Sequence, residues 1–430
     1  MKPKYWLPLG ALVLGASATA ACTSDFTSCI ETRTCPLGGA GGEAGDTSEA
    51  SATAGNVGKG GSHSSAGAPG KGDAGQEDHA AGSGGEAGAI LPEECSADLD
   101  LKSDPKNCGV CGHDCLGGEC DLGRCQPVAI TPMQIHTSDI ATDGTYVFWS
   151  GANPGDKTYY VARRRIDRAD EVKVIAPNEP RVEGLTASAT AVYWLGAGQV
   201  RECISPDCAM GPTNVEPTTA SCFKIHYSSN GSTPALYWTC QTQYAQNNGS
   251  FWSAATSASA PVHIQPQSAN PTGLTSDADS VYWVNASGFN SESNLDPDGA
   301  VWRLKLSNGA TTKLVSGLTG QMGNVAVGGG KIYFDGVDNT ISSVPLPNGA
   351  LKPTKVADGS VVGGMVADTQ ALYWSDYASG AIARCPHSGC VTPEVVALGQ
   401  THPLRLTQDA TSIYWISNYD DGAPIRRLAK

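Results

Sequence analysis

A short aromatic motif that recurs seven times is the feature that most restricts the fold of this chain. Each copy is an aliphatic residue followed by two aromatic residues: Val147-Phe148-Trp149, Val192-Tyr193-Trp194, Leu236-Tyr237-Trp238, Val281-Tyr282-Trp283, Ile332-Tyr333-Phe334, Leu372-Tyr373-Trp374 and Ile413-Tyr414-Trp415. The last aromatics of successive copies are 45, 44, 45, 51, 40 and 41 residues apart. A period of this length with β-rich patterning is typical of one four-stranded propeller blade per repeat. The sequence therefore predicts an all-β fold, a seven-bladed β-propeller over residues 126–430, with six or eight blades as the alternatives.

Each repeat divides into four expected strands. An apolar pair such as Leu274-Thr275 lies nine and eight positions before the final aromatic and predicts the inner strand. An aspartate, such as Asp277, then opens a tight turn into the aromatic strand. The seventh repeat lacks a fourth strand, and residues 126–130 resemble that strand in other repeats. We therefore expect the N-terminal segment to close the ring, which removes exposed sheet edges.

Cysteine spacing predicts disulfide bonds inside the propeller. Cys203 and Cys208, like Cys385 and Cys390, occupy the turn between the third and fourth strands of a repeat. Cys222 and Cys240 flank the inner and aromatic strands of the third repeat. We expect Cys203–Cys208, Cys222–Cys240 and Cys385–Cys390 bridges. The alternative is zinc binding, for which His387 is the only histidine at useful spacing, and we expect no metal.

A second group of cysteines lies in residues 92–125, ahead of the propeller. The six are Cys95, Cys108, Cys111, Cys115, Cys120 and Cys125. Three disulfides in a small loop-rich module are expected, because no apolar core is present to hold the segment. A zinc site that uses His113 is the alternative. Residues 104–115 resemble the DPxNCGxCGxxC modules of secreted and surface proteins of myxobacteria, a resemblance that implies no particular chemistry.

The N-terminal residues predict export. Lys2 and Lys4 precede an apolar run that ends in small residues before Cys22, so residues 1–21 have the pattern of a signal peptide. The pattern resembles bacterial lipoprotein signals, although Thr19 stands where an aliphatic residue is usual, and it implies lipidation of Cys22. Cleavage without lipidation is the alternative. Removing Cys22 from 15 cysteines leaves 14, an even number that can pair completely.

The segment after Cys22 is expected to be a tether. Residues 22–37 contain a Cys29–Cys35 pair, and residues 38–91 are rich in Gly, Ala and Ser and contain no aromatic residue. Such a composition cannot bury enough apolar surface to fold, so the sequence predicts a disordered linker. In the lipoprotein resemblance, Thr23 rather than Asp after the cysteine implies the outer membrane or cell surface. The lipid would be the only membrane anchor.

Composition and motifs bear on function mainly by exclusion. A net charge of −14 argues against nucleic-acid binding. The chain has no Ser-His-Asp signature, phosphate-binding loop or His-Glu-x-x-His motif, and we expect no cofactor. Residues 294–299 resemble a calcium loop only faintly, and a turn is the simpler interpretation. We expect a monomer.

The candidate binding site is a polar ring where the chain enters the inner strands. Thirteen residues before the final aromatics stand His136, Arg181, Asn270, Gln321, Val361 and His402, with Ser221 equivalent if the third repeat contains a four-residue insertion. We expect this ring, with Glu183 and Arg405, to bind a ligand. The alternative is that loop residues near a solvated channel are simply polar. Tyrosines expected in or near the loops between second and third strands could stack on sugars, namely Tyr159, Tyr160, Tyr377 and Tyr419.

Two propeller families share features with the repeats. Tyr373-Trp374-Ser375-Asp376 resembles the YWTD-type propellers of the lipoprotein-receptor family, which bind partners, but six of the seven repeats lack the aspartate and that ring has six blades. The repeats are also similar to those of streptogramin lyase-type propellers, which are enzymes. The leading prediction is a surface protein that binds a protein or glycan without catalysis. The alternatives are a lyase or hydrolase that uses His136 or His402, and a purely structural protein.

Overall fold

A computed structural model of the chain describes residues 99–430, except 135, 154, 156, 169–171, 219–220, 231–233, 242–248, 257–259, 269, 287–298, 319–322, 337–338, 347–351, 359–360 and 418–421. The expected signal peptide, Cys22, the Cys29–Cys35 pair and the linker lie outside these residues. In the described part of the chain, no helix has the length and apolar character required to cross a bilayer.

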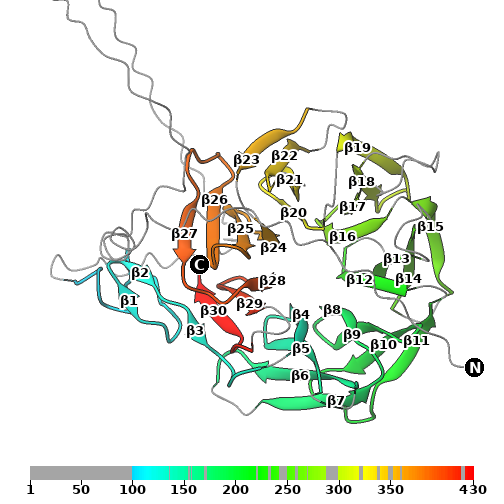
Figure 1. Cartoon of the computed structure of the whole chain (residues 1–430), viewed down its shortest axis with the longest axis horizontal. Helices are drawn as coiled ribbons and strands as arrows, with labels where there is room; N and C mark the ends of the chain where they lie inside the picture. Colours follow the sequence, from blue (N-terminus) through cyan, green and yellow to red (C-terminus); the bar gives the residue numbers. More distant parts are fainter. Residues whose placement is uncertain are drawn as a thin grey trace, which may run out of the picture. The chain divides into compact units, whose positions relative to one another are not determined.

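The described strands form seven four-stranded antiparallel sheets arranged as blades of a β-propeller (Figure 1). Successive blades comprise β4 (Thr137–Thr142), β5 (Tyr146–Ala152), β6 (Tyr159–Arg165) and β7 (Lys173–Glu179); β8 (Glu183–Ala187), β9 (Ala191–Gly196), β10 (Gln199–Ile204) and β11 (Thr213–Pro217); β12 (Ser221–Ser228), β13 (Ala235–Gln241), β14 (Gly249–Ala255) and β15 (Val262–Ser268); β16 (Pro271–Ser276), β17 (Ser280–Asn285), β18 (Gly299–Lys305) and β19 (Thr311–Leu318); β20 (Val325–Gly328), β21 (Lys331–Asp335), β22 (Ile341–Pro345) and β23 (Thr354–Ala357); β24 (Val362–Ala367), β25 (Ala371–Asp376), β26 (Ala381–Pro386) and β27 (Glu394–Ala397); and β28 (Pro403–Gln408), β29 (Ser412–Ser417), β30 (Arg426–Ala429) and β3 (Val128–Ala129). We number these blades one to seven in this order. The predicted fold and blade count are confirmed.

The aromatic motif forms the second strand of each blade and supplies the core. Its last residue is buried in every blade, as Trp149, Trp194, Trp238, Trp283, Phe334, Trp374 and Trp415. Trp283 of blade four packs against Phe251 of blade three, with ring centroids 4.4 Å apart. Apolar contacts between neighbouring blades, rather than one central core, therefore hold the ring together.

Aspartate side chains organise the turn before the aromatic strand, as the sequence predicted. In blade four, Oδ1 of Asp277 accepts hydrogen bonds of 2.9 Å from the amides of Asp279 and Ser280. Its Oδ2 accepts a 2.8 Å hydrogen bond from the Tyr282 hydroxyl. Asp409 makes the same set of contacts in blade seven. In these two blades the tyrosine of the motif thus anchors the turn, while the tryptophan fills the core.

The N-terminal strand β3 closes the ring by pairing with β30. Val128 lies opposite Arg427 and Ala129 opposite Arg426, in an antiparallel ladder. The cysteine-rich module precedes this strand and contains the short hairpin β1 (Cys120–Asp121) and β2 (Arg124–Cys125). Cys115 belongs to the same buried cluster as Leu428. The module therefore packs on blade seven, the blade that the following strand β3 completes.

The three disulfides expected in the propeller are present as Cys203–Cys208, Cys222–Cys240 and Cys385–Cys390. In the module, Cys108 is bonded to Cys120 and Cys115 to Cys125. Cys111 is also disulfide-bonded, and Cys95 lies outside the described residues. The sulfur atoms of Cys108, Cys115 and Cys125 lie within 4.8 Å of one another because two bridges are adjacent.

Loss of the Cys222–Cys240 bridge is expected to destabilise the propeller more than loss of either hairpin bridge. Its cysteines are 18 residues apart, whereas those of the hairpin bridges are 5 apart. Loop-closure entropy gives about 3 kcal/mol for the longer loop and about 2 kcal/mol for the shorter ones. Denaturant unfolding of the Cys222→Ser/Cys240→Ser and Cys385→Ser/Cys390→Ser double variants measures the difference. Equal losses would contradict the entropic explanation.

Candidate functional site

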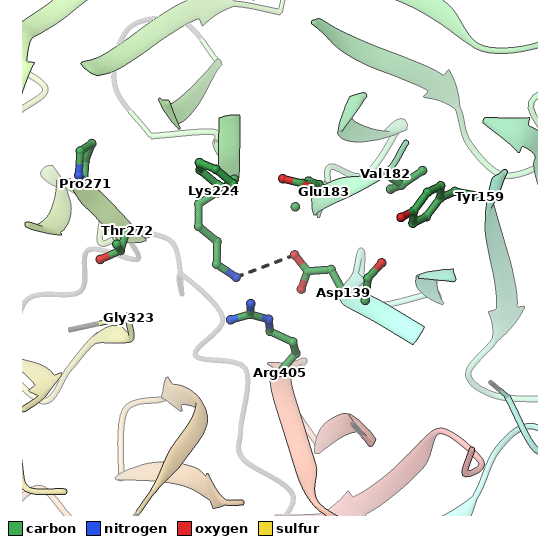
Figure 2. Close-up of a pocket in the computed structure, with 12 residues that line it drawn as sticks. Asp139, Tyr159, Val182, Glu183, Lys224, Pro271, Thr272, Gly323 and Arg405 are labelled. Atoms are coloured by element: carbon green, nitrogen blue, oxygen red, sulfur yellow. Dashed lines mark ion pairs between the residues drawn. The ribbon is translucent and has the colours of Figure 1, made fainter. Parts of the chain in front are cut away.

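A cavity of about 410 Å³ lies at the end of the central channel where the inner strands begin. We name this end the upper mouth and the cavity the upper cavity. Its walls carry the charged residues Asp139, Glu183, Lys224 and Arg405, and the apolar or aromatic residues Tyr159, Val182 and Pro271 (Figure 2). Phe223 also lines the cavity. A volume of this size is within the range of small-molecule sites. A second cavity of about 370 Å³ continues along the inner strands and shares Asp139, Lys224 and Arg405.

Three of these charged residues, Asp139, Lys224 and Arg405, come from one repeated position of the inner strand, whereas Glu183 lies one residue before it. The repeated position is the residue just before the one paired with the last aromatic, as Ile140 pairs with Trp149 and Leu406 with Trp415. Around the ring this position holds Asp139, Gly184, Lys224, Gly273, Asn324, Gly364 and Arg405. A β-bulge lies at or next to it in six blades. A bulge changes the direction in which a side chain points. Bulges at the start of the inner strands can therefore turn these side chains towards the channel.

Glycines at this position allow neighbouring inner strands to approach each other. A Cβ at Gly364 would lie 2.6 Å from the Leu406 amide nitrogen and 2.8 Å from the Cα of Arg405. Gly184 has a φ of +63°, and its Cβ would lie 3.3 Å from the Cα of Lys224. Only glycine fits such approaches without displacing the neighbouring backbone. The alternation of glycine with larger polar residues therefore lets the charged groups converge in a narrow channel.

Asp139 is fixed by the backbone and faces Lys224. Its Oδ1 accepts a 3.0 Å hydrogen bond from the Ile140 amide, and its Oδ2 accepts one of 3.0 Å from the Leu185 amide of the next blade. The Nζ atom of Lys224 lies 3.9 Å from Oδ2 of Asp139 (Figure 2). This separation is long for an ion pair, so the carboxylate holds its position mainly through the amides.

The two cations at the upper mouth influence each other. Burial lowers the pKa of Lys224 to about 8, the nearby Arg405 lowers it as well, and Asp139 opposes both effects. Lys224 therefore remains mostly protonated at neutral pH. The guanidinium of Arg405 points into the same space (Figure 2). It forms no hydrogen bond or ion pair with the residues that the structure describes.

Glu183 is paired with Arg181, so these two charges offset each other. The side chain of Arg181 is half exposed, whereas that of Glu183 is mostly covered. Asp139, Lys224 and Arg405 then leave the upper cavity with one net positive charge. This local charge is opposite in sign to the net charge of −14 of the whole chain.

Most residues of the ring expected at the mouth do not line the cavity. Of the predicted residues that the structure describes, Glu183 and Arg405 line it, and His136, Arg181, Asn270 and His402 do not. The carbonyl groups of His136, Asn270 and Val361 accept hydrogen bonds from Ala152, Ala286 and Tyr377, respectively. These residues thus tie the ends of the aromatic strands to the inner strands.

The other candidate positions are spread around this face. His402 stacks on Tyr377 with ring centroids 4.7 Å apart. Tyr159 lines the upper cavity, whereas Tyr160 packs with the buried cluster of Trp149. Ser221 begins β12. Gln321, Tyr419 and residues 294–298 of the calcium-like stretch lie outside the described residues.

Three residues of the channel were not predicted from the sequence: Asp139 and Lys224 at the upper mouth, and His226 deeper in the channel. The signal for the first two was available: they stand ten residues before the last aromatic, once the insertion in the third repeat is allowed for. The Nε2 atom of His226 lies 2.8 Å from the Ser276 hydroxyl of the next blade. Burial lowers the pKa of His226 to about 4, so this side chain is neutral at physiological pH. No histidine lines the upper cavity among the described residues.

No protein-family model matches the chain. No curated protein matches it either. Among solved structures, a streptogramin B lyase aligns with 11% sequence identity and a TM-score of 0.50, over 70% of this chain and 96% of that one. The virginiamycin B lyase of Staphylococcus aureus aligns with 13% identity and a TM-score of 0.51, over 71% and 98%. A catalytically inactive variant of that lyase with quinupristin gives 13% and 0.50 over the same shares. At this level of identity, these similarities establish that the chain has the β-propeller fold of those proteins.

Proposed function

We propose that this protein is an exported surface lipoprotein whose propeller binds a glycan or protein partner at the upper cavity. The observation that supports this proposal best is the cavity itself. Charged side chains from blades one, three and seven converge there, at a position that is glycine in three other blades. Their convergence creates local charge without filling the channel, as a binding site requires.

The sequence and the disulfides support the proposed cellular location. A lipid on Cys22 would anchor the chain, and residues 38–91 would hold the propeller away from the membrane. The bridges in the propeller and the module are typical of an oxidising compartment outside the cytosol. A surface location would give the upper cavity access to external partners.

A propeller enzyme is the second candidate, and Lys224 is the observation that favours it. An amine with a pKa of about 8 beside a carboxylate is suited to proton transfer near neutral pH. His136 and His402, the expected acid or base groups, do not line the upper cavity. Any catalysis there would therefore depend on Lys224 rather than on histidine.

Blocking the upper cavity is expected to abolish partner binding. Thr272 lines it, and Thr272→Trp would place an indole ring in the binding space. The purified protein and this variant would be applied to arrays of cell-surface glycans and to cell-surface extracts, with mass spectrometry of retained and altered molecules. Retention by the wild type alone supports binding, whereas a changed product supports the enzyme.

Thr312→Trp is the matched control, because Thr312 is exposed on the outer strand β19. A second variant, Tyr159→Ala, removes one wall of the cavity without adding bulk. Thermal melting verifies that each variant is folded. Full partner binding by folded Thr272→Trp and Tyr159→Ala proteins would rule out the upper cavity as the site.

A further inference from the structure

Two cationic side chains that are far apart in the sequence lie close together at the upper mouth. Lys224 belongs to blade three and Arg405 to blade seven. The ammonium of Lys224 and the guanidinium of Arg405 both point into the centre of the channel (Figure 2). The proximity of Arg405 disfavours the charged form of Lys224. Two like charges held together in a partly covered space are stabilised when an anion lies between or beside them.

The protein itself provides only part of the negative charge that the two cations require. Asp139 accepts hydrogen bonds from two backbone amides and lies 3.9 Å from Lys224. Arg405 is partly buried and forms no ion pair or hydrogen bond with the described part of the chain. A guanidinium has five N–H donors in a planar arrangement that matches a carboxylate with two parallel hydrogen bonds. The unused donors of Arg405 thus point to an external oxyanion.

The charge balance favours a carboxylate over a phosphate. Asp139, Lys224 and Arg405 sum to one positive charge, and Glu183 is balanced by Arg181. One carboxylate neutralises this cluster, whereas a phosphate monoester carries about −1.5 to −2 charges at neutral pH. The second negative charge of a phosphate would then face Asp139 without compensation.

The rest of the lining suits a sugar ring. Tyr159 and Phe223 are aromatic residues of the lining, and Ser138 and Thr272 are its hydroxyl residues. The Ser138 hydroxyl forms a hydrogen bond with that of Ser150, and the Thr272 hydroxyl donates to the Val284 carbonyl. Each oxygen keeps a lone pair that can accept a further hydrogen bond. Aromatic faces pack against the C–H face of a pyranose ring, while hydroxyl oxygens accept hydrogen bonds from the sugar hydroxyls. We propose that the upper cavity binds an acidic sugar, a uronic acid residue of a polysaccharide, through its carboxylate, with Lys224 and Arg405 as the residues that recognise it. This inference rests on the proposed binding function.

Calorimetric titration with uronic acid oligosaccharides tests the proposal directly. The probes are trisaccharides of galacturonate, glucuronate and mannuronate, each compared with its methyl ester, which removes the charge and retains the sugar. We expect at least one acid form to bind and its ester to bind roughly 10- to 100-fold more weakly, as for loss of a charge-assisted hydrogen-bonded pair. Lys224→Met and Arg405→Gln should each weaken binding of the acid form by a similar factor.

Matched controls separate this effect from general electrostatics. Lys352 and Arg168 are exposed and lie away from the upper cavity, so Lys352→Met and Arg168→Gln should leave the affinity unchanged. Equal binding of acid and ester, or of wild type and both cavity variants, would overturn the proposal. Failure of all three acid forms would do so as well.

Two further outcomes distinguish this inference from the proposed function. Binding of another partner that is sensitive to Thr272→Trp, with no binding of any uronate, would leave the binding site in place and refute its acidic-sugar specificity. The second outcome is tighter binding of a hexaglutamate peptide than of every uronate trisaccharide, with the same dependence on Lys224 and Arg405. That result would show that the cavity recognises carboxylates of a protein partner, and it would refute the sugar assignment.

Discussion

Replacing Trp283 with alanine is expected to lower the free energy of unfolding by about 3–5 kcal/mol, the usual range for truncating a buried aromatic residue. Its side chain is fully buried, and it packs on Phe251 of the preceding blade and on Trp302 of its own blade. The substitution therefore opens a cavity at the joint between two blades. Urea unfolding followed by tryptophan fluorescence measures the loss.

Trp302→Ala is the matched control in the same blade. Trp302 is only partly buried on the third strand, and Lys313 lies over its ring at 5.1 Å. We expect a smaller loss there, on the order of 1–2 kcal/mol. Similar losses for the two variants would show that the repeated aromatic position has no special role in joining blades.

The sequence was sufficient to predict the architecture because the same physical requirement recurs in every blade. A blade must bury its second strand on both faces, so the motif ending in Trp149, Trp283 or Trp415 repeats where other positions vary. Closure of the ring was predictable for a related reason. The seventh repeat lacked one strand, and residues 126–130 matched it.

The site was harder to predict because it depends on register. A count of thirteen residues back from the aromatic selects His136 and Asn270, whose carbonyl groups support the strand ends. A count of ten selects Asp139, Lys224 and Arg405, which line the cavity. The β-bulges at the start of the inner strands decide which side chain turns inward, and sequence periodicity does not reveal a bulge.

Glycine was the overlooked signal for that register. Gly184, Gly273 and Gly364 stand at the same count of ten, and each is closely approached by a neighbouring inner strand. Few positions hold the same residue in several repeats. Glycine ten residues before the last aromatic in three blades therefore marks a position where neighbouring backbones lie close together. The larger residues at that count in the other blades are then the ones that project into the remaining space.

Replacing Lys224 with methionine is expected to stabilise the free protein at neutral pH by about 1–3 kcal/mol while removing the carboxylate recognition proposed for it. The pKa of Lys224 is about 8 in the folded protein, against 10.5 for an ordinary lysine, so burial of the charge opposes folding. Below pH 8 the amine is protonated in both the folded and unfolded states, and the full penalty is present. Between pH 8 and 10.5 the unfolded chain binds more protons, so the stability of the wild type rises with pH.

The difference in stability between the Lys224→Met variant and the wild type should therefore shrink between pH 8 and 10.5. Comparing the two proteins by urea unfolding at several pH values cancels the titration of other groups, such as Tyr193 and Tyr282. Lys224→Arg keeps its charge throughout this range, so its stability relative to Lys224→Met should be nearly constant. A gain for Lys224→Met that does not vary with pH would mean that methionine stabilises the channel by packing alone. The buried charge that opposes folding of the free protein is the charge that the proposed carboxylate ligand would neutralise, because a buried ammonium is stabilised when an anion accompanies it.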